Sequence, residues 1–163
     1  MGTGKSAVGL ALAKQLNRPF VDVDTLIEKQ VGQSIAEIFL QKGEAHFRQV
    51  EAEITRGVAS GQGQVVATGG GAVLDEKNLS ALKSNGWLVW LKAKPDVIQQ
   101  RVGDVESRPL LQDGTDAKDR IVELLALREV HYAKADVAIE TSDRSINSIV
   151  DDILKQLPKQ EKA

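Results

Sequence analysis

The sequence predicts an α/β domain in which a mainly parallel sheet is covered by helices. Apolar segments that suit short strands occur at residues 20–23, 64–68, 87–91 and 137–140, and segments with helical spacing separate them. Residues 87–91 are uniformly apolar, which is typical of a strand that is covered on both faces. The length of 163 residues, of which 42% are hydrophobic, suits one domain with a sizeable core.

Helices are predicted where apolar residues recur at helical spacing and where capping residues begin or end the pattern. Ser34 and Glu37 have the spacing of a capping box, and Gly43 separates the helix that they begin from a longer one. Asp75 suits the start of a further helix, whereas residues 103–115 contain glycine, proline and charges and are expected to form a loop. The predicted helices span residues 5–16, 25–31, 34–42, 44–60, 76–85, 95–102, 116–134 and 146–157.

The charge balance and the absence of cysteine exclude several function classes. The 21 basic and 23 acidic residues give a net charge of −2, which provides no electrostatic attraction for nucleic acid or a membrane surface. A chain without cysteine has no disulfide, no thiol chemistry and no cysteine-bound metal. No apolar run approaches the roughly 18 residues of a membrane span, and no signal peptide is visible after Met1. We therefore expect a cytoplasmic protein without nucleic-acid or membrane partners. We also expect it to be a monomer.

Residues 2–6, here called the phosphate loop, end as the phosphate-binding pattern G-x-x-x-x-G-K-S/T ends. Backbone N–H groups before a helix form an anion site, and Gly2 and Gly4 let that backbone approach phosphates closely. Lys5 supplies a positive charge for the transferring phosphate, and the Ser6 hydroxyl suits Mg²⁺. The alternative, a chance glycine-rich turn, is disfavoured by the amphipathic helix that follows directly.

The phosphate loop lacks the strand that normally precedes it. The first glycine of the pattern would lie three residues before Gly2, and the apolar strand would lie before that glycine. Such a strand would be central in the sheet, so its absence should leave an apolar slot between its neighbours. We therefore expect the natural protein to begin upstream of Met1.

Two further segments suit a ligand site at the ends of strands. Asp22 and Asp24 follow an apolar segment, and residues two apart on a strand face the same side. One carboxylate could orient Mg²⁺ and the other could accept a proton, although both residues also suit turns and helix caps. Residues 68–71, here called the glycine loop, contain three successive glycines whose bare N–H groups allow a ligand to approach closely.

The arginines cannot be ranked from spacing alone. Arg48 lies at helical spacing from Glu44 and Glu51, which is also the spacing of ordinary surface pairs. Arg128 belongs to a long charged helix on which a solvated face is the default, and Arg108 lies in a loop where it could cover a phosphate or be exposed. The remaining residues of interest are expected to be structural, in the core or on the surface: His46, His131, Trp87 and Trp90.

The motifs together are far more specific than the phosphate loop alone. They closely resemble those of the shikimate kinase family, which consists of P-loop enzymes similar to nucleoside monophosphate kinases. The resemblance implies a three-layer α/β sandwich with a five-stranded parallel sheet of P-loop kinase type, whose first and central strand is missing here. It also implies a single domain over residues 1–163, with a substrate-binding helical region at about 24–60 and a mobile lid at about 103–115. The motifs, in order, are MGTGKS, FVDVD, GEAHFRQVE, ATGGGAV, RPLL and LREVHYAKAD.

The resemblance implies phosphorylation of the 3-hydroxyl of shikimate by ATP with Mg²⁺, giving 3-phosphoshikimate in aromatic amino-acid biosynthesis. Ser6 and Asp22 would hold the metal, and Glu51 would hold Arg48 in place. The residues implied for ATP are Gly2, Thr3, Gly4, Lys5, Ser6, Ala7, Arg101, Arg108 and Arg144. Those implied for shikimate are Asp24, Arg48, Gly70, Gly71 and Arg128. The catalytic residues would be Lys5, Asp24, which is the base or orienter, and Arg108, which would cover the transferring phosphate from the lid.

Two other functions compete with this interpretation. Another small-metabolite kinase of the same fold, such as a gluconate kinase, is disfavoured by the two substrate-side arginines and the D-x-D pattern. A non-catalytic nucleotide-binding module is disfavoured because Lys5, Ser6, Asp24 and Arg108 occur together. Release of ADP with and without shikimate would separate the alternatives.

Overall fold

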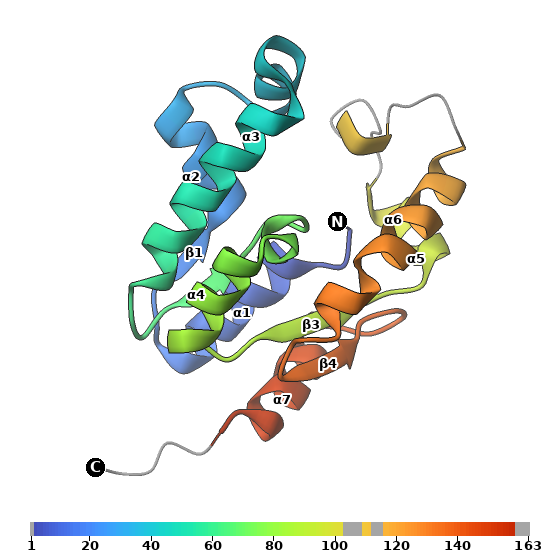
Figure 1. The fold of residues 1–163 in the computed structure, drawn as a ribbon. Coiled ribbons are helices and arrows are strands. Elements are labelled where there is room, and N and C mark those ends of the chain that lie inside the picture. Colours follow the sequence, from blue (N-terminus) through green and yellow to red (C-terminus); the bar gives the residue numbers. More distant parts are fainter. Residues whose placement is uncertain (1, 103–108, 112–115, 159–163) are drawn as a thin grey trace.

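The structure is a computed structural model, and it describes residues 2–102, 109–111 and 116–158. Within these ranges, helices and short strands alternate along the chain (Figure 1). None of the described helices is both long enough and apolar enough to cross a membrane. The helices are α1 Lys5–Leu16, α2 Val23–Val31, α3 Ile35–Ala59, α4 Glu76–Asn85, α5 Pro95–Val102, α6 Ala117–Tyr132 and α7 Ile146–Gln156. The strands are β1 Phe20–Asp22, β2 Val65–Ala67, β3 Val89–Lys92 and β4 Val137–Glu140.

The strands form two separate parallel pairs. β1 pairs with β2, with Phe20 opposite Val65, and β3 pairs with β4, with Val89 opposite Val137. The described residues thus contain two two-stranded sheets, and they do not confirm the five-stranded sheet that the resemblance implied. The α/β character and the parallel pairing agree with the prediction.

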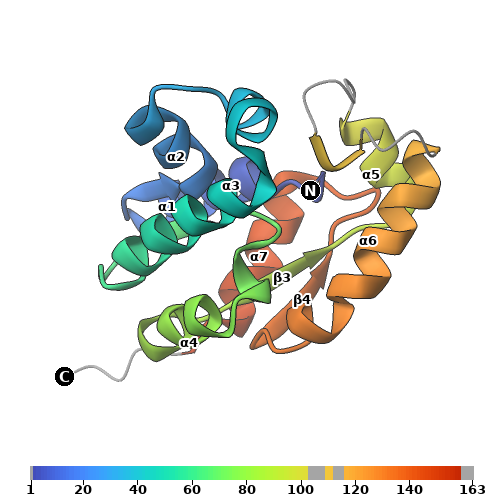
Figure 2. The ribbon, with the colours of Figure 1, turned by 45° about the horizontal axis from the view of Figure 1, so that its top comes forward.

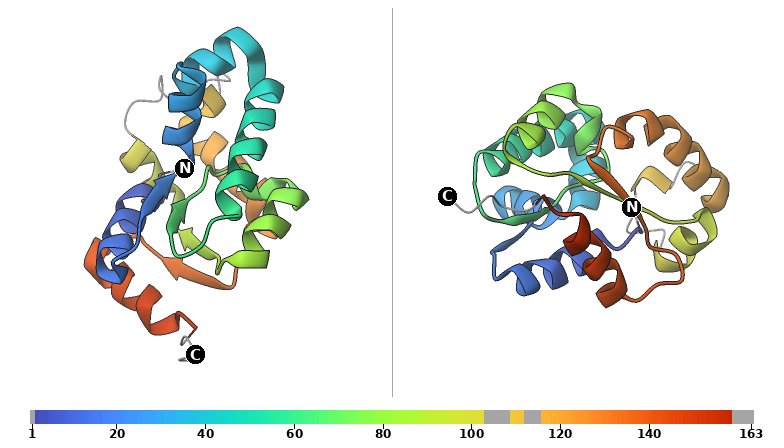
Figure 3. Two further views of the ribbon diagram at one scale, coloured as in Figure 1. Left: turned by 90° about the vertical axis from the view of Figure 1, so that its left-hand side faces the viewer. Right: turned by 90° about the horizontal axis from the view of Figure 1, so that it is seen from below.

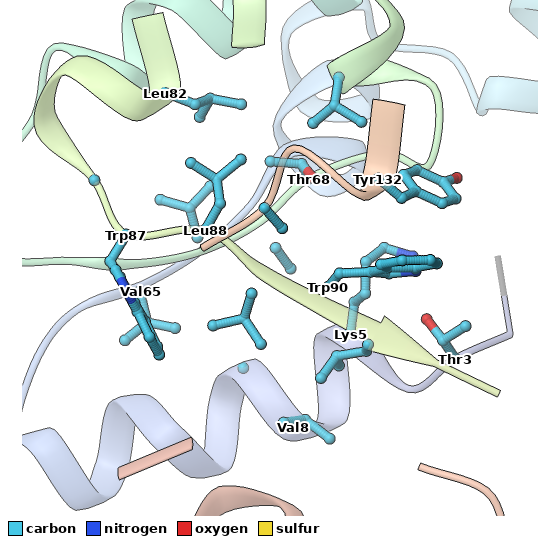
Figure 4. A pocket seen from close by; sticks show the side chains of 18 of the residues that line it. Thr3, Lys5, Val8, Val65, Thr68, Leu82, Trp87, Leu88, Trp90 and Tyr132 are labelled. Atoms are coloured by element: carbon cyan, nitrogen blue, oxygen red, sulfur yellow. The ribbon is translucent and has the colours of Figure 1, made fainter. Parts of the chain in front are cut away.

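A cavity of about 580 Å³ lies between the two pairs of strands (Figure 4). Its walls include the facing strands β2 and β3 and the apolar side of α1, from which Val8 and Leu12 contribute. Trp87, Trp90 and Tyr132 also line it. The cavity therefore occupies the place where the sequence predicts an apolar slot.

Helices cover the strands from two sides, which gives three layers (Figure 3). α1 and α7 lie together on one side, and α3, α4 and α6 lie on the other. One apolar cluster joins α1 and α7 to β3 and β4, a second lies within α2 and α3, and a third joins α5 to α6. The N-terminal end of the chain lies between the α2–α3 region and the α5–α6 region (Figure 2). The phosphate loop is thus placed between two helical regions.

Local capping explains most of the helix boundaries. Ser34 and Glu37 form the predicted capping box, and Asp75 caps α4 as expected. Gly43 has φ 78° and ψ 170°, which breaks α3 into two helical parts at the predicted place. The loop predicted over residues 103–115 contains a 3₁₀ turn at Pro109–Leu111, and the rest of it lies outside the described residues.

The predicted boundary between the first strand and the helix that follows it is wrong. The strand expected over residues 20–23 ends at Asp22, and α2 begins at Val23 rather than at residue 25. The Asp22 side chain accepts hydrogen bonds from the N–H groups of Asp24 and Thr25, so it caps α2. Asp24 consequently lies in the first turn of a helix and not on a strand.

Candidate functional site

The phosphate loop has the backbone shape of an anion site before α1. Gly2 has φ 65° and Gly4 has φ 90°, both in the left-handed region that favours glycine. A Cβ at Gly2 would also lie 2.9 Å from Cγ2 of Ile98 on α5, so glycine is required there for space as well. Lys5 and Ser6 are the first residues of α1, where the helix N-terminus favours a negative ligand.

Ser6 and Asp22, the predicted metal pair, are in direct contact. The Ser6 hydroxyl donates to Oδ2 of Asp22 over 2.6 Å, while Oδ1 of Asp22 accepts from the N–H of Asp24 over 3.0 Å. The Asp22 side chain caps α2, and its second oxygen faces Ser6, so the cap is compatible with the predicted metal role. A hydroxyl and a carboxylate are the oxygen ligands that Mg²⁺ prefers, and Mg²⁺ completes its shell with water and phosphate. The pair fits that ion.

Contrary to the expectation from the sequence, Asp22 and Asp24 do not lie on the same face of a strand. Their proximity follows instead from the start of α2, because Asp22 is the capping residue and Asp24 lies in the first turn. Asp24 reaches the glycine loop, where its Oδ1 would lie 3.1 Å from a Cβ placed on Gly69. The strand end and the helix start thus direct the Asp22 carboxylate toward Ser6 and the Asp24 carboxylate toward the glycine loop.

Arg48 is held between two carboxylates of α3. Its Nη1 donates to Glu51 over 2.6 Å, and its Nη2 donates to Glu44 over 3.0 Å. The Glu51 side chain is only 3% exposed, whereas that of Glu44 is 52% exposed. Burial raises the pKa of the Glu51 carboxyl, and Arg48 opposes this effect. Glu51 is therefore the buried partner that holds Arg48, as the resemblance implies.

The glycine loop packs directly against this ion pair. A Cβ on Gly69 would overlap Oε1 of Glu51, and a Cβ on Gly71 would overlap the guanidinium of Arg48. Gly71 has φ −95°, which any residue can adopt, so glycine is needed there for space and not for conformation. Gly69 and Gly71 thus leave space for the charged side chains of α3.

Arg128 is buried, which contradicts the default expectation of a solvated helix face. It is 7% exposed and acts on the Glu51 carboxyl electrostatically, so α6 reaches the same cluster as α3. Tyr132 lies one turn further along α6, and its hydroxyl donates to the Gly70 carbonyl over 2.7 Å. No role for Tyr132 was expected from the sequence, although it stands four residues after Arg128 and therefore on the same helix face.

The arginines expected near ATP converge on the segment after β4. Arg101 donates to Oγ1 of Thr141 over 3.1 Å and to its carbonyl over 2.7 Å. The same hydroxyl lies 3.3 Å from the carbonyl of Thr3, which connects Arg101 to the phosphate loop. Arg144 pairs with Asp152 over 2.6 Å on α7 and so has a structural partner. Arg108 lies outside the described residues.

Similar proteins agree on one family. A family model described as shikimate kinase matches residues 1–158. The shikimate kinase of Symbiobacterium thermophilum is 44% identical over 160 residues, which cover 96% of this chain and 91% of that protein. The shikimate kinase of Desulforudis audaxviator is 45% identical over 157 residues, which cover 96% and 82% of the two chains.

Solved structures give the same result. The shikimate kinase from Acinetobacter baumannii in complex with shikimate matches with a TM-score of 0.91 and 34% identity, over 97% of this chain and 91% of that chain. The shikimate kinase from Aquifex aeolicus matches with a TM-score of 0.83 and 37% identity, over 96% and 91%. Sequence and fold thus lead to one conclusion, which the phosphate loop and the arginine cluster also support: this chain belongs to the shikimate kinase family.

Proposed function

We propose that the chain transfers the terminal phosphoryl group of ATP to the 3-hydroxyl of shikimate, giving 3-phosphoshikimate and ADP in the pathway to aromatic amino acids. Membership of the family makes it a phosphotransferase with an alcohol as acceptor. The observation that carries the proposal is the convergence of Arg48 and Arg128 on Glu51, beside the glycine loop. Two arginines at one polar loop suit a small substrate that carries one carboxylate.

On the nucleotide side, the phosphate loop would bind the ATP phosphates through its N–H groups, with Lys5 as the mobile positive charge. Ala7 would add one further N–H group in the first turn of α1. Ser6 and Asp22 would hold Mg²⁺ directly and through water, because their oxygens already lie 2.6 Å apart. The ion would neutralise phosphate charge and keep the phosphates in line for transfer.

On the substrate side, Arg48 and Arg128 would bind the shikimate carboxylate with charge-assisted hydrogen bonds. Asp24 would accept a hydrogen bond from the reacting hydroxyl and orient it or take its proton. Gly70 and Gly71 would contribute backbone groups. Phosphoryl transfer depends mainly on positioning and charge neutralisation, so this fixed set of groups meets its main demands.

Three arginines complete the proposal on the ATP side. Arg101 and Arg144 would lie near the adenine, where Arg101 is already held by Thr141. Arg108 would cover the transferring phosphate from the lid, which would close over ATP and keep water away. We also propose a monomer in the cytoplasm, as expected from the sequence.

The experiment that tests the function is release of ADP by the purified chain, coupled to a spectroscopic readout. Shikimate should stimulate ADP release by orders of magnitude over the rate without substrate, and gluconate should not. Stimulation by gluconate instead would favour another small-metabolite kinase of this fold. Tight ATP binding without stimulation by either compound would favour a non-catalytic nucleotide-binding module.

A further inference from the structure

We propose that Tyr132 is a positioning residue, which aims the backbone N–H of Gly71 into the shikimate site. The inference rests on the proposed function and gives a role to Tyr132, which lies within the motif LREVHYAKAD but has no role assigned from the resemblance. Tyr132 is half-buried at the end of α6, and its hydroxyl donates to the Gly70 carbonyl over 2.7 Å. The two residues are 62 positions apart in the sequence, so the bond connects two separate parts of the fold.

The hydrogen bond from Tyr132 restrains the whole peptide group between Gly70 and Gly71, and not only the carbonyl that it contacts. The carbonyl of Gly70 and the N–H of Gly71 belong to one planar peptide group, and this group is trans because the described residues contain no cis peptide. The C=O and N–H bonds of a trans peptide group point in opposite directions. Fixing the carbonyl therefore also fixes the direction of the N–H. Neither glycine has a Cβ to restrain this plane, and the Tyr132 hydroxyl supplies the restraint.

The Gly71 N–H is available to a ligand. Within the described part of the chain, it donates to no protein acceptor, whereas the carbonyl of Gly71 accepts from the N–H of Leu74 over 3.0 Å. Gly71 also lies against the guanidinium of Arg48. An anionic or hydroxyl oxygen of a substrate held by Arg48 would therefore meet a donor whose direction Tyr132 sets.

Tyr132 itself is held firmly and shares its helix face with Arg128. Its ring centroid lies 5.7 Å from that of Trp90 on β3, and the two rings lie close together in Figure 4. Tyr132 and Arg128 also line one small pocket between α5 and α6. One face of α6 therefore provides both the buried Arg128 and the Tyr132 hydroxyl, which orients the glycine loop.

The first test is Tyr132→Phe, which removes the hydroxyl and keeps the ring. The KM for shikimate should rise by about fivefold, while the KM for ATP and kcat should each change by less than about twofold. A purely structural role would lower the melting temperature and leave the ratio of the two KM values unchanged. The matched control is Ser84→Ala, because the Ser84 hydroxyl also donates to a carbonyl, that of Ala81, over 2.8 Å on α4. Ser84→Ala should change neither KM.

A second test uses the fact that Tyr132 is the only tyrosine in the sequence. Replacement of tyrosine by 3-fluorotyrosine gives one fluorine resonance, which should shift when the intact chain is saturated with shikimate and stay in place with gluconate. A resonance that shikimate does not move would overturn the inference, even if Tyr132→Phe fails to fold.

The positioning role of Tyr132 and the proposed function can be refuted separately. An active parent chain whose Tyr132→Phe variant keeps its shikimate KM refutes the positioning role alone. A parent chain that shikimate does not stimulate refutes the proposed function, and the inference falls with it.

Discussion

The Ser6 hydroxyl donates a 2.6 Å hydrogen bond to Oδ2 of Asp22, and this bond joins the start of α1 to the end of β1. The other oxygen of Asp22 caps α2, so one carboxylate connects the phosphate loop to the helix that carries Asp24. The two sides of the proposed reaction, nucleotide and substrate, therefore meet at one residue. Charge and capping at Asp22 can be separated by substitution, because asparagine caps helices as well as aspartate does.

Asp22→Asn should keep α2 capped and weaken metal binding. We expect the Mg²⁺ concentration for half-maximal activity to rise by about tenfold or more, because a ligand or its orienting partner loses its charge. The melting temperature should change little. The control is Asp75→Asn, since Asp75 caps α4 in the same way and has no part in the proposed site. An unchanged Mg²⁺ requirement in Asp22→Asn would remove Asp22 from the metal site.

Removal of the metal gives an independent check. Activity should require Mg²⁺ or Mn²⁺, and EDTA should abolish it in a way that excess Mg²⁺ reverses. The rate of ADP release with shikimate is the measurement. Full turnover in EDTA would contradict the metal roles of both Ser6 and Asp22.

Arg128→Lys should weaken shikimate binding by about tenfold or more, a loss of ~1.4 kcal/mol or greater. Lysine keeps the positive charge but loses the planar fork that can bind a carboxylate with two hydrogen bonds. ATP affinity should barely change, because the phosphate loop is a separate surface. Arg48→Lys should behave similarly and also disturb Glu51. Arg56→Lys on exposed α3 surface is the control, and equal shikimate affinity in all three variants would return the two arginines to a structural role.

Glu51 predicts a pH dependence. Its pKa is raised by burial, so the folded chain binds this proton more tightly than the unfolded chain does. The stability that Glu51 contributes is thus greatest below the pKa of a free glutamate and falls as pH rises through its folded pKa. Arg48, in contrast, needs the ionised carboxylate, so the KM for shikimate should rise as pH falls through the raised pKa of the Glu51 carboxyl.

The pH effect can be assigned by comparing two glutamates that contact Arg48. Glu51→Gln should remove this acid dependence of the shikimate KM, because its amide does not titrate. Glu44→Gln should leave it in place, since Glu44 is exposed and pairs with Arg48 from the solvent side. KM values measured between about pH 5 and pH 8 would decide, and an acid dependence that survives in Glu51→Gln would assign it to another group.

The parts of the fold that depend on neighbouring residues could be predicted from the sequence. The capping box at Ser34, the break at Gly43 and the cap at Asp75 all involve side chains and backbone within a few positions of each other. The end of β1 was misplaced because Asp22 ends the strand and caps α2 at the same time. A residue with two local roles gives an ambiguous pattern.

The parts of the site that depend on distant segments could not be predicted from spacing. Arg48 and Glu51 have the spacing of a surface pair. Glu51 is nevertheless buried, because Gly69, which is distant in the sequence, packs against its carboxylate. Arg128 likewise lies on a helix whose charges suggested exposure. The role of Tyr132 depends on a carbonyl 62 residues away, which no periodicity reveals.

The cavity between β2 and β3 has the position and the lining that an additional strand needs. In the described part of the chain, β2 pairs only with β1 and β3 pairs only with β4, so each has an edge without a partner strand. The cavity of about 580 Å³ between them is lined by apolar side chains of α1, β2 and β3. A strand placed there would pair with both edges and bury its side chains against this lining.

An apolar, β-branched segment of about six residues, added ahead of Met1 with a short glycine-containing turn, should therefore stabilise the fold. We expect the melting temperature to rise by at least about 5 °C, equivalent to roughly 1–3 kcal/mol for a chain of this size. The matched control carries a segment of equal length made of glycine and serine, which cannot fill an apolar slot. Equal melting temperatures for the two extended chains would show that the cavity does not accept a strand, because the extensions differ only in the side chains that would be buried there.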